Sequence, residues 1–166
     1  MTVTNVQKDP ATLTLRITSE FDAPVARAWQ LWEDPRQLEQ WWGPPTYPAT
    51  FVDHDLRAGG IVTYFMTGPE GDTPHGWWRV LAVDAPQRLE FEDGFGDHPE
   101  SPTPDMPVMI IRVALDERSD GGTRMAVETV FPSVDAMEQI ISMGMAEGMS
   151  EALGQIDELL RVEATT

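Results

Sequence analysis

The chain has 166 residues, 41% hydrophobic and 23% charged, and its 28 acidic against 11 basic residues give a formal charge of −17. This length suits one domain with a substantial core, so we expect a single domain over residues 1–166, with 11–161 as the core and mobile tails. The acidity disfavours nucleic acid and anionic membranes as partners, and the lack of cysteine excludes disulfides and thiolate chemistry.

The first elements predicted along the chain are a strand and two short helices. Residues 12–21 alternate apolar and polar side chains, as a half-buried strand does. Pro24 suits the first turn of a helix that ends before Pro35, and Pro35 opens a second helix that ends at Trp42.

The middle of the chain predicts an antiparallel sheet. We expect six further strands, joined mostly by tight turns, at residues 49–56, 61–67, 76–83, 87–93, 108–116 and 124–131. The acidic stretch 94–107 contains four prolines, which predicts a long exposed loop. With apolar Phe95 and Met106 in it, this loop is either a lid or an ordinary surface loop.

The last long segment, 133–161, predicts an amphipathic helix. Ser133 can cap its first turn, and apolar residues recur at three- and four-residue steps to form one broad stripe. Gly144 and Gly148 lie on the apolar side, where the missing side chains either let a strand or ring pack closely or form the floor of a cavity. One helix over an antiparallel sheet gives an α+β, two-layer architecture.

Several short pieces also occur in a characteristic order over residues 13–160: Phe21-Asp22-Ala23-Pro24, Trp41-Trp42-Gly43-Pro44, Asp55-Leu56-Arg57-Ala58-Gly59-Gly60, Gly68-Pro69-Glu70-Gly71, Pro86-Gln87-Arg88-Leu89 and Glu147-Gly148-Met149-Ser150. In the order and spacing of these pieces, the chain resembles the START-like, or SRPBCC, superfamily, and within it the homologues of the activator of the 90-kDa heat-shock protein ATPase. The resemblance implies a START-like domain with the helix-grip fold. In that fold a curved seven-stranded antiparallel sheet wraps around a long C-terminal helix, two short helices lie between strands one and two, and a hydrophobic cavity separates helix from sheet.

The resemblance does not carry a ligand with it, because the superfamily includes lipid and hormone carriers, cyclases and proteins without an assigned activity. The chain also departs from the family at Met149, which replaces a common tryptophan, and in its Gly76-Trp77-Trp78 sequence. We expect inward-facing residues of both layers to line the cavity: Trp41, Trp42, Tyr64, Met66, Trp78, Phe91, Met109, Ile111, Ile141, Gly144, Met145, Gly148 and Met149. Each of them can also be read as ordinary core, and the methionines as gap-filling side chains.

No catalytic, metal or cofactor site is expected from the sequence. In Asp53-His54-Asp55, strand alternation places His54 on the face opposite the two acids. Arg112 and Glu128 lie within strands and form either a surface pair or a polar anchor inside the cavity. There is no nucleophile elbow and no phosphate-binding glycine loop.

These features favour a non-catalytic protein that binds a small hydrophobic molecule, lipid-like or aromatic, between helix and sheet. No bilayer-length apolar run and no signal-peptide pattern occur, so we expect a cytoplasmic location. Two alternatives stay open. One is a cyclase- or dehydratase-like enzyme that uses an inward-facing acid, arginine or tyrosine, with Tyr64 as a candidate, and the other is a chaperone-interaction module that uses the acidic surface.

Overall fold

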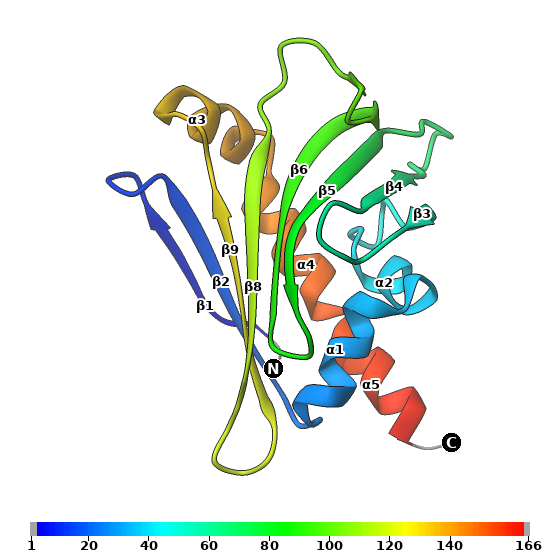
Figure 1. Ribbon diagram of the computed structural model, residues 1–166, viewed down its shortest axis with the longest axis vertical. Coiled ribbons are helices and arrows are strands. Elements are labelled where there is room, and N and C mark those ends of the chain that lie inside the picture. The colour runs from blue at the N-terminus through cyan, green and yellow to red at the C-terminus, as the bar shows by residue number, and fades with distance from the viewer. Residues whose placement is uncertain (1–2, 165–166) are drawn as a thin grey trace.

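The computed structural model describes residues 3–164 and shows one antiparallel sheet with the helices packed against it (Figure 1). The sheet contains β1 (Val3–Asp9), β2 (Thr14–Phe21), β3 (Ala49–His54), β4 (Ile61–Met66), β5 (His75–Asp84), β6 (Arg88–His98), β8 (Met109–Glu117) and β9 (Thr123–Val130). Their spatial order is β1-β2-β9-β8-β6-β5-β4-β3, and the two-residue β7 (Ser101–Pro102) pairs with β6. Strands β2 and β9 are therefore neighbours, as the helix-grip fold requires.

The sheet has nine strands where seven were expected. The first addition is β1, which lies in the segment expected to be a tail and pairs with β2 from Val3↔Ser19 to Asp9↔Thr14. Most of β1 is exposed, so it lacks the apolar alternation by which a strand is recognised in a sequence. The second is β7, inside the stretch expected to be a plain loop, where the backbone N–H of Thr103 donates to the carbonyl of Phe95.

Two short helices follow β2, as predicted. Helix α1 (Val25–Glu33) ends at Asp34, whose side chain accepts a hydrogen bond from the backbone N–H of Arg36 and so caps α2 (Pro35–Trp41). The indole of Trp41 then donates to the carbonyl of Leu31 over 3.0 Å, which joins the two helices.

The C-terminal helix runs from Val134 to Ala164, but it is interrupted twice. Its segments are α3 (Val134–Ser142), α4 (Met145–Gly154) and α5 (Ile156–Ala164). Ser133 caps α3 as expected, by accepting from the N–H of Ala136. The first interruption is at Gly144, whose φ of +88° is a left-handed conformation that an α-helix cannot continue through. Figure 1 shows α4 crossing behind the strands.

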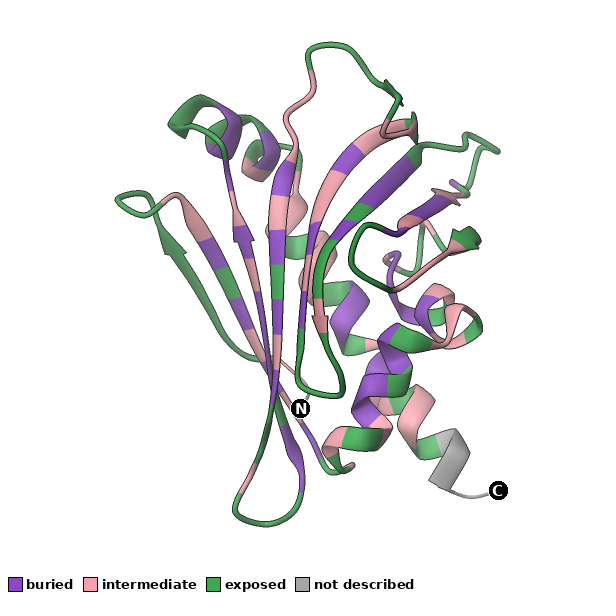
Figure 2. Cartoon of the chain, in the orientation of Figure 1, coloured by how far each residue is buried: buried purple, intermediate pink, exposed green. Residues whose placement is uncertain are grey.

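The core lies between the sheet and the helices, and in Figure 2 buried residues alternate with exposed ones along the central strands. Its centre is a cluster of seven buried aromatic residues: Trp32, Trp41, Trp42, Phe51, Tyr64, Trp78 and Phe91. The rings of Trp78 and Phe91 are stacked with their centroids 4.0 Å apart, and those of Trp42 and Trp78 meet edge to face at 4.9 Å. Such pairs add to the free energy gained from burying aromatic surface.

Candidate ligand-binding site

The residues expected to line a cavity separate into two groups. The first consists of seven that are buried, with Tyr64 the most exposed at 8%: Trp41, Trp42, Tyr64, Trp78, Phe91, Met109 and Ile111. The second consists of six that are half-buried: Met66, Ile141, Gly144, Met145, Gly148 and Met149. Tyr64, Trp78, Phe91, Met109 and Ile111 are therefore buried, as their predicted inward direction requires, whereas Met66 and the members from α3, α4 and their junction lie at the edge of the core.

A half-buried carboxyl group lies among the aromatic residues of the inner face. Asp93 is directly opposite Trp78 on β5 and Met109 on β8, so its side chain shares their face of the sheet. The hydroxyl of Tyr64 donates to Oδ1 of Asp93 over 3.4 Å. Asp93 was not among the residues expected in the site, because it falls at the predicted end of a strand, although alternation from Leu89 and Phe91 points to it.

The surroundings of Asp93 change its acidity. Burial raises the pKa of its carboxyl from 3.8 to about 7, and the hydrogen bond from Tyr64 only partly opposes this. Burial, followed by the neighbouring Asp93, raises the pKa of Tyr64 well above its ordinary value. Near neutral pH the site therefore contains a neutral phenol beside a carboxyl group that can hold or release a proton.

Two buried indole N–H groups next to this pair make no hydrogen bond of ordinary geometry within the described part of the chain. They are Nε1 of Trp42, a residue 4% exposed, and Nε1 of Trp78, which is fully buried. Both indoles act as hydrogen-bond donors toward the hydroxyl oxygen of Tyr64 and so lower the pKa of Tyr64, and that oxygen is the acceptor they face.

Other buried indoles of the chain show how such groups are normally satisfied. Trp41 donates to the carbonyl of Leu31, and Trp77 donates to the carbonyl of Phe95 over 3.1 Å. Trp32 donates to the sulfur of Met125 over 3.3 Å. Trp29 also finds no acceptor among residues 3–164, but it is outside the aromatic cluster. Trp42 and Trp78 are the two members of the aromatic cluster whose indole N–H groups make no such hydrogen bond among the described residues.

Helix α4 and the junction before it have open space beside two glycines. A Cβ atom added at Gly148 would meet no heavy atom of the described chain within 4 Å, which contradicts close packing of a strand or ring at this position. The same holds at Gly144. At its other end α4 is held to the cluster, because Nε2 of Gln155 donates to the carbonyl of Gly43 over 2.7 Å.

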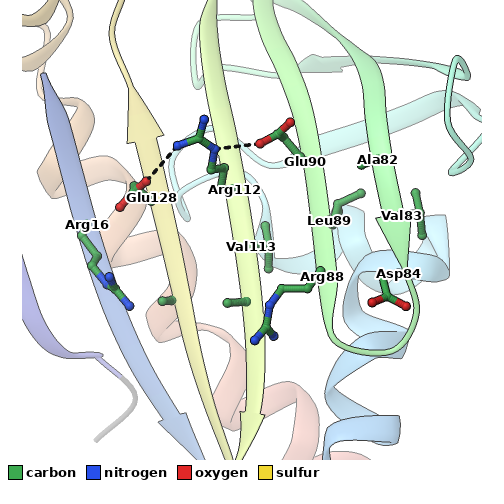
Figure 3. A pocket seen from close by; sticks show the side chains of 12 residues that line it. Arg16, Ala82, Val83, Asp84, Arg88, Leu89, Glu90, Arg112, Val113 and Glu128 are labelled. Atoms are coloured by element: carbon green, nitrogen blue, oxygen red, sulfur yellow. Dashed lines mark hydrogen bonds and ion pairs between the residues drawn. The ribbon is translucent and has the colours of Figure 1, made fainter. Parts of the chain in front are cut away.

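The outer face of the sheet has a groove of about 420 Å³ (Figure 3). Unlike the inner face, it is lined by many charged side chains. Arg112 lies between Glu90 and Glu128, at 2.7 and 3.5 Å, and Arg16 and Arg88 also line the groove. The pair of Arg112 and Glu128 is therefore a surface pair, and the alternative of an anchor inside a cavity is wrong. Charges of both signs alternate across the strands, as they do on a solvated sheet surface.

The remaining polar motif has a structural role. Nε2 of His54 is 2.9 Å from the carbonyl oxygen of Trp32, and Asp53 accepts a hydrogen bond from the hydroxyl of Thr63 over 2.7 Å. Among the described residues no group of three or more His, Cys, Asp and Glu side chains could hold a metal ion. None of the described helices is long and apolar enough to cross a membrane.

Comparison with known proteins places this geometry in context. The family model described as "Activator of Hsp90 ATPase homolog 1-like protein" matches residues 22–161. The crystal structure of protein Ms6760 from Mycobacterium smegmatis is 52% identical, with a TM-score of 0.87 over 95% of this chain and 96% of that one. A solution NMR structure of a protein from Arthrobacter aurescens is 46% identical, with a TM-score of 0.90 over 96% of this chain and 92% of that one.

A more distant structure shares the fold alone. It is CalU16 from Micromonospora echinospora, 21% identical, with a TM-score of 0.55 over 92% of this chain and 82% of that one. None of the curated proteins compared with the chain matched it.

Proposed function

Because the chain belongs to the family of Activator of Hsp90 ATPase homolog 1-like proteins, we propose that it binds a small hydrophobic molecule, lipid-like or aromatic, between its C-terminal helices and the inner face of the sheet. The helix-grip fold of this family is consistent with ligand binding. The proposal uses the two groups of residues described above, the buried aromatic wall and the half-buried edge.

The observation that carries the proposal is the polar group set in the aromatic wall. A core that serves stability alone gains nothing from a half-buried carboxyl group with a raised pKa held beside a phenol among aromatic rings. Binding sites for small molecules, in contrast, are mostly apolar with a few polar groups that orient the ligand.

The half-buried edge supports the same interpretation. Met66, Met145 and Met149 are unbranched and can change conformation around a guest at low cost. Gly148 is half-buried on α4, and the open space beside it would accommodate part of a guest.

The experiment combines native mass spectrometry with tryptophan fluorescence, using a panel of lipids and aromatic polyketides. Because Trp42 and Trp78 belong to the proposed site, a ligand should quench the fluorescence of the protein. Gly148→Leu should weaken binding of the best ligand about tenfold or more by filling the space beside α4. Gly154→Leu is the matched control, because Gly154 is also in α4 and open but is exposed. If no member of the panel binds, or if the two variants bind equally well, the proposal is wrong.

A second function is favoured by a specific observation, the contact of Asp93 with Tyr64. A carboxyl group with a pKa of about 7 can donate and accept protons at neutral pH, as a cyclase or dehydratase requires of its acid–base residue. In that case Asp93→Asn should abolish turnover of a bound ligand and leave its binding nearly unchanged. Mass spectrometry of the ligand after incubation would detect the turnover, and an unaltered ligand would leave binding as the function.

A further inference from the structure

We propose that this protein self-associates through strand β1, which pairs antiparallel with β1 of a second copy across a two-fold axis at Val6. This surface is not part of the proposed ligand site, and self-association does not depend on the function of that site. The two edges of the sheet differ in how their backbone is covered, and β1 is the uncovered one.

An edge strand exposes a row of backbone N–H and C=O groups with which another strand can pair. On the edge strand β3, side chains of α2 cover such groups. Nη2 of Arg36 donates to the carbonyl of Phe51 over 2.8 Å, and the N–H of Phe51 donates to Oε2 of Glu39 over 3.0 Å. At the opposite edge, β1 pairs with β2 on one side, and no described strand pairs with its other side (Figure 1). Strand β1 is therefore the open edge of the sheet within residues 3–164.

An apolar side chain at this edge lacks the cover that a further strand would give it. Val6 is directly opposite Ile17, which is 1% exposed, so Val6 lies on the inner face of the sheet with the core. Val6 is nevertheless 46% exposed, because no described strand lies on its other side. A second β1 would place a side chain about 5 Å from Val6 and bury apolar surface of both copies.

The sequence of β1 is complementary to itself in the antiparallel direction. With the two-fold axis at Val6, this residue faces its own copy, and Asn5 of each copy faces Gln7 of the other. Lys8 and Asp9 then lie opposite the uncharged start of the other strand, so no like charges meet. Parallel pairing in register would instead place each of these two charges beside its own copy.

The charge around β1 also suits a second copy. Lys8 and Asp9 cancel, and Arg16 on β2, opposite Gln7, adds one positive charge, so this edge is not acidic although the chain carries −17. Two copies can therefore approach here with little local repulsion, while their total charge still opposes association at low salt. One pair of strands is a small interface, so we expect a weak dimer with a Kd on the order of 10–100 µM at about 300 mM NaCl.

Sedimentation velocity over about 1–500 µM protein, at about 50 and about 300 mM NaCl, measures the association. We expect a monomer–dimer equilibrium that becomes severalfold tighter at the higher salt, because screening reduces the repulsion between two acidic molecules. In ¹H–¹⁵N spectra, the backbone signals of β1 should shift or broaden as the protein concentration rises, and those of β3 should not.

Variants of two exposed valines locate the interface. Val6→Lys should weaken the dimer about tenfold or more, because it removes the apolar pair and places like charges opposite each other. Val52→Lys is the matched control, since Val52 is a 65% exposed valine of the other edge strand and the change in net charge is the same, and this variant should dimerise as the wild type does. A mixture of Val6→Lys with Val6→Asp should associate about tenfold more tightly than either variant alone, because opposite charges then meet at the axis.

Three results would overturn the proposal: a wild type that stays monomeric at about 500 µM in about 300 mM NaCl, a dimer that weakens with salt, or a dimer that Val52→Lys disrupts as strongly as Val6→Lys. A dimer that weakens with salt would indicate contact between charged surfaces elsewhere. If the mixture of the two Val6 variants stays monomeric, the register with Val6 at the axis is wrong. Should Val6→Lys prove unstable, the salt dependence and the spectra of the wild type still decide.

Discussion

Asp93 shows how one residue links stability to pH. Its pKa in the folded protein is about 7, whereas a solvated aspartate titrates near 3.8. Between these values the folded state binds more protons than the unfolded state, so the free energy of unfolding falls as pH rises. The stability associated with protonated Asp93 is thus complete below about pH 4 and is lost as pH passes through about 7.

The first prediction follows from this fall of the unfolding free energy with rising pH. The wild type should lose about 2–4 kcal/mol of unfolding free energy between about pH 4 and pH 8 through Asp93, and Asp93→Asn should lose much less. Urea denaturation at several pH values measures the difference between the two. Glu92→Gln is the control, since this neighbouring acid pairs with Arg79 on the outer face. A constant difference between wild type and Asp93→Asn across this range would contradict the assignment.

The second prediction compares two fully buried tryptophans in the protein without ligand. Trp41→Phe removes the hydrogen bond to the carbonyl of Leu31, whereas Trp78→Phe removes an N–H group that makes no hydrogen bond of ordinary geometry among residues 3–164. Both changes lose similar volume, so Trp41→Phe should cost about 1 kcal/mol more. Urea denaturation of the two variants tests this, and a larger cost at Trp78 would show that its indole is already bonded.

At the scale of elements, the interruption of the C-terminal helix gives the third prediction. Gly144→Ala should destabilise by about 1–2 kcal/mol, because alanine resists the φ of +88°. Gly148→Ala should stabilise by about 0.5–1 kcal/mol, because alanine is the better helix former and its methyl group meets no described atom within 4 Å. Denaturation curves of the matched pair should therefore move in opposite directions, and a shift of both in one direction would contradict this account.

The elements that a sequence predicts well are those set by a repeating pattern. Alternation predicted the central strands, and the cap at Ser133 was correct. Periodicity does not reveal backbone conformation, so the left-handed turn at Gly144 was missed. Strand β1 was missed because its residues are mostly exposed. Strand β6 continues past residue 93 because Gly94 lets the ring of Trp77 pack against the backbone, which only the neighbouring strand reveals.

Like the fold, the candidate site could be predicted from the sequence only where a repeating pattern fixes the side-chain direction. The inward direction of Tyr64, Trp78 and Phe91 follows from alternation alone. The role of Asp93 does not, because an acid at a predicted strand end is normally exposed. That two indole N–H groups make no hydrogen bond of ordinary geometry within residues 3–164 depends on the packing of α2 against the sheet, which no local pattern encodes.

For the whole molecule, the dominant electrostatic feature is the excess of negative charge. Each ion pair in the described part of the chain has at least one partner whose side chain is 42% exposed or more, so each contributes at most about 1 kcal/mol. The formal charge of −17 acts across the entire surface and favours expansion of the chain. It also repels anions.

The fourth prediction is that salt stabilises this protein. Raising NaCl from about 10 mM to about 300 mM shortens the Debye length severalfold and screens the repulsion between surface acids, which should outweigh the weakening of exposed ion pairs. We expect Tm to rise by several degrees, as measured by differential scanning calorimetry. Arg112→Ala sharpens the test, because it leaves Glu90 and Glu128 without the guanidinium between them. This variant should be less stable by about 1 kcal/mol at low salt and approach the wild type at high salt, whereas a fall in Tm with salt would mean that the ion pairs dominate.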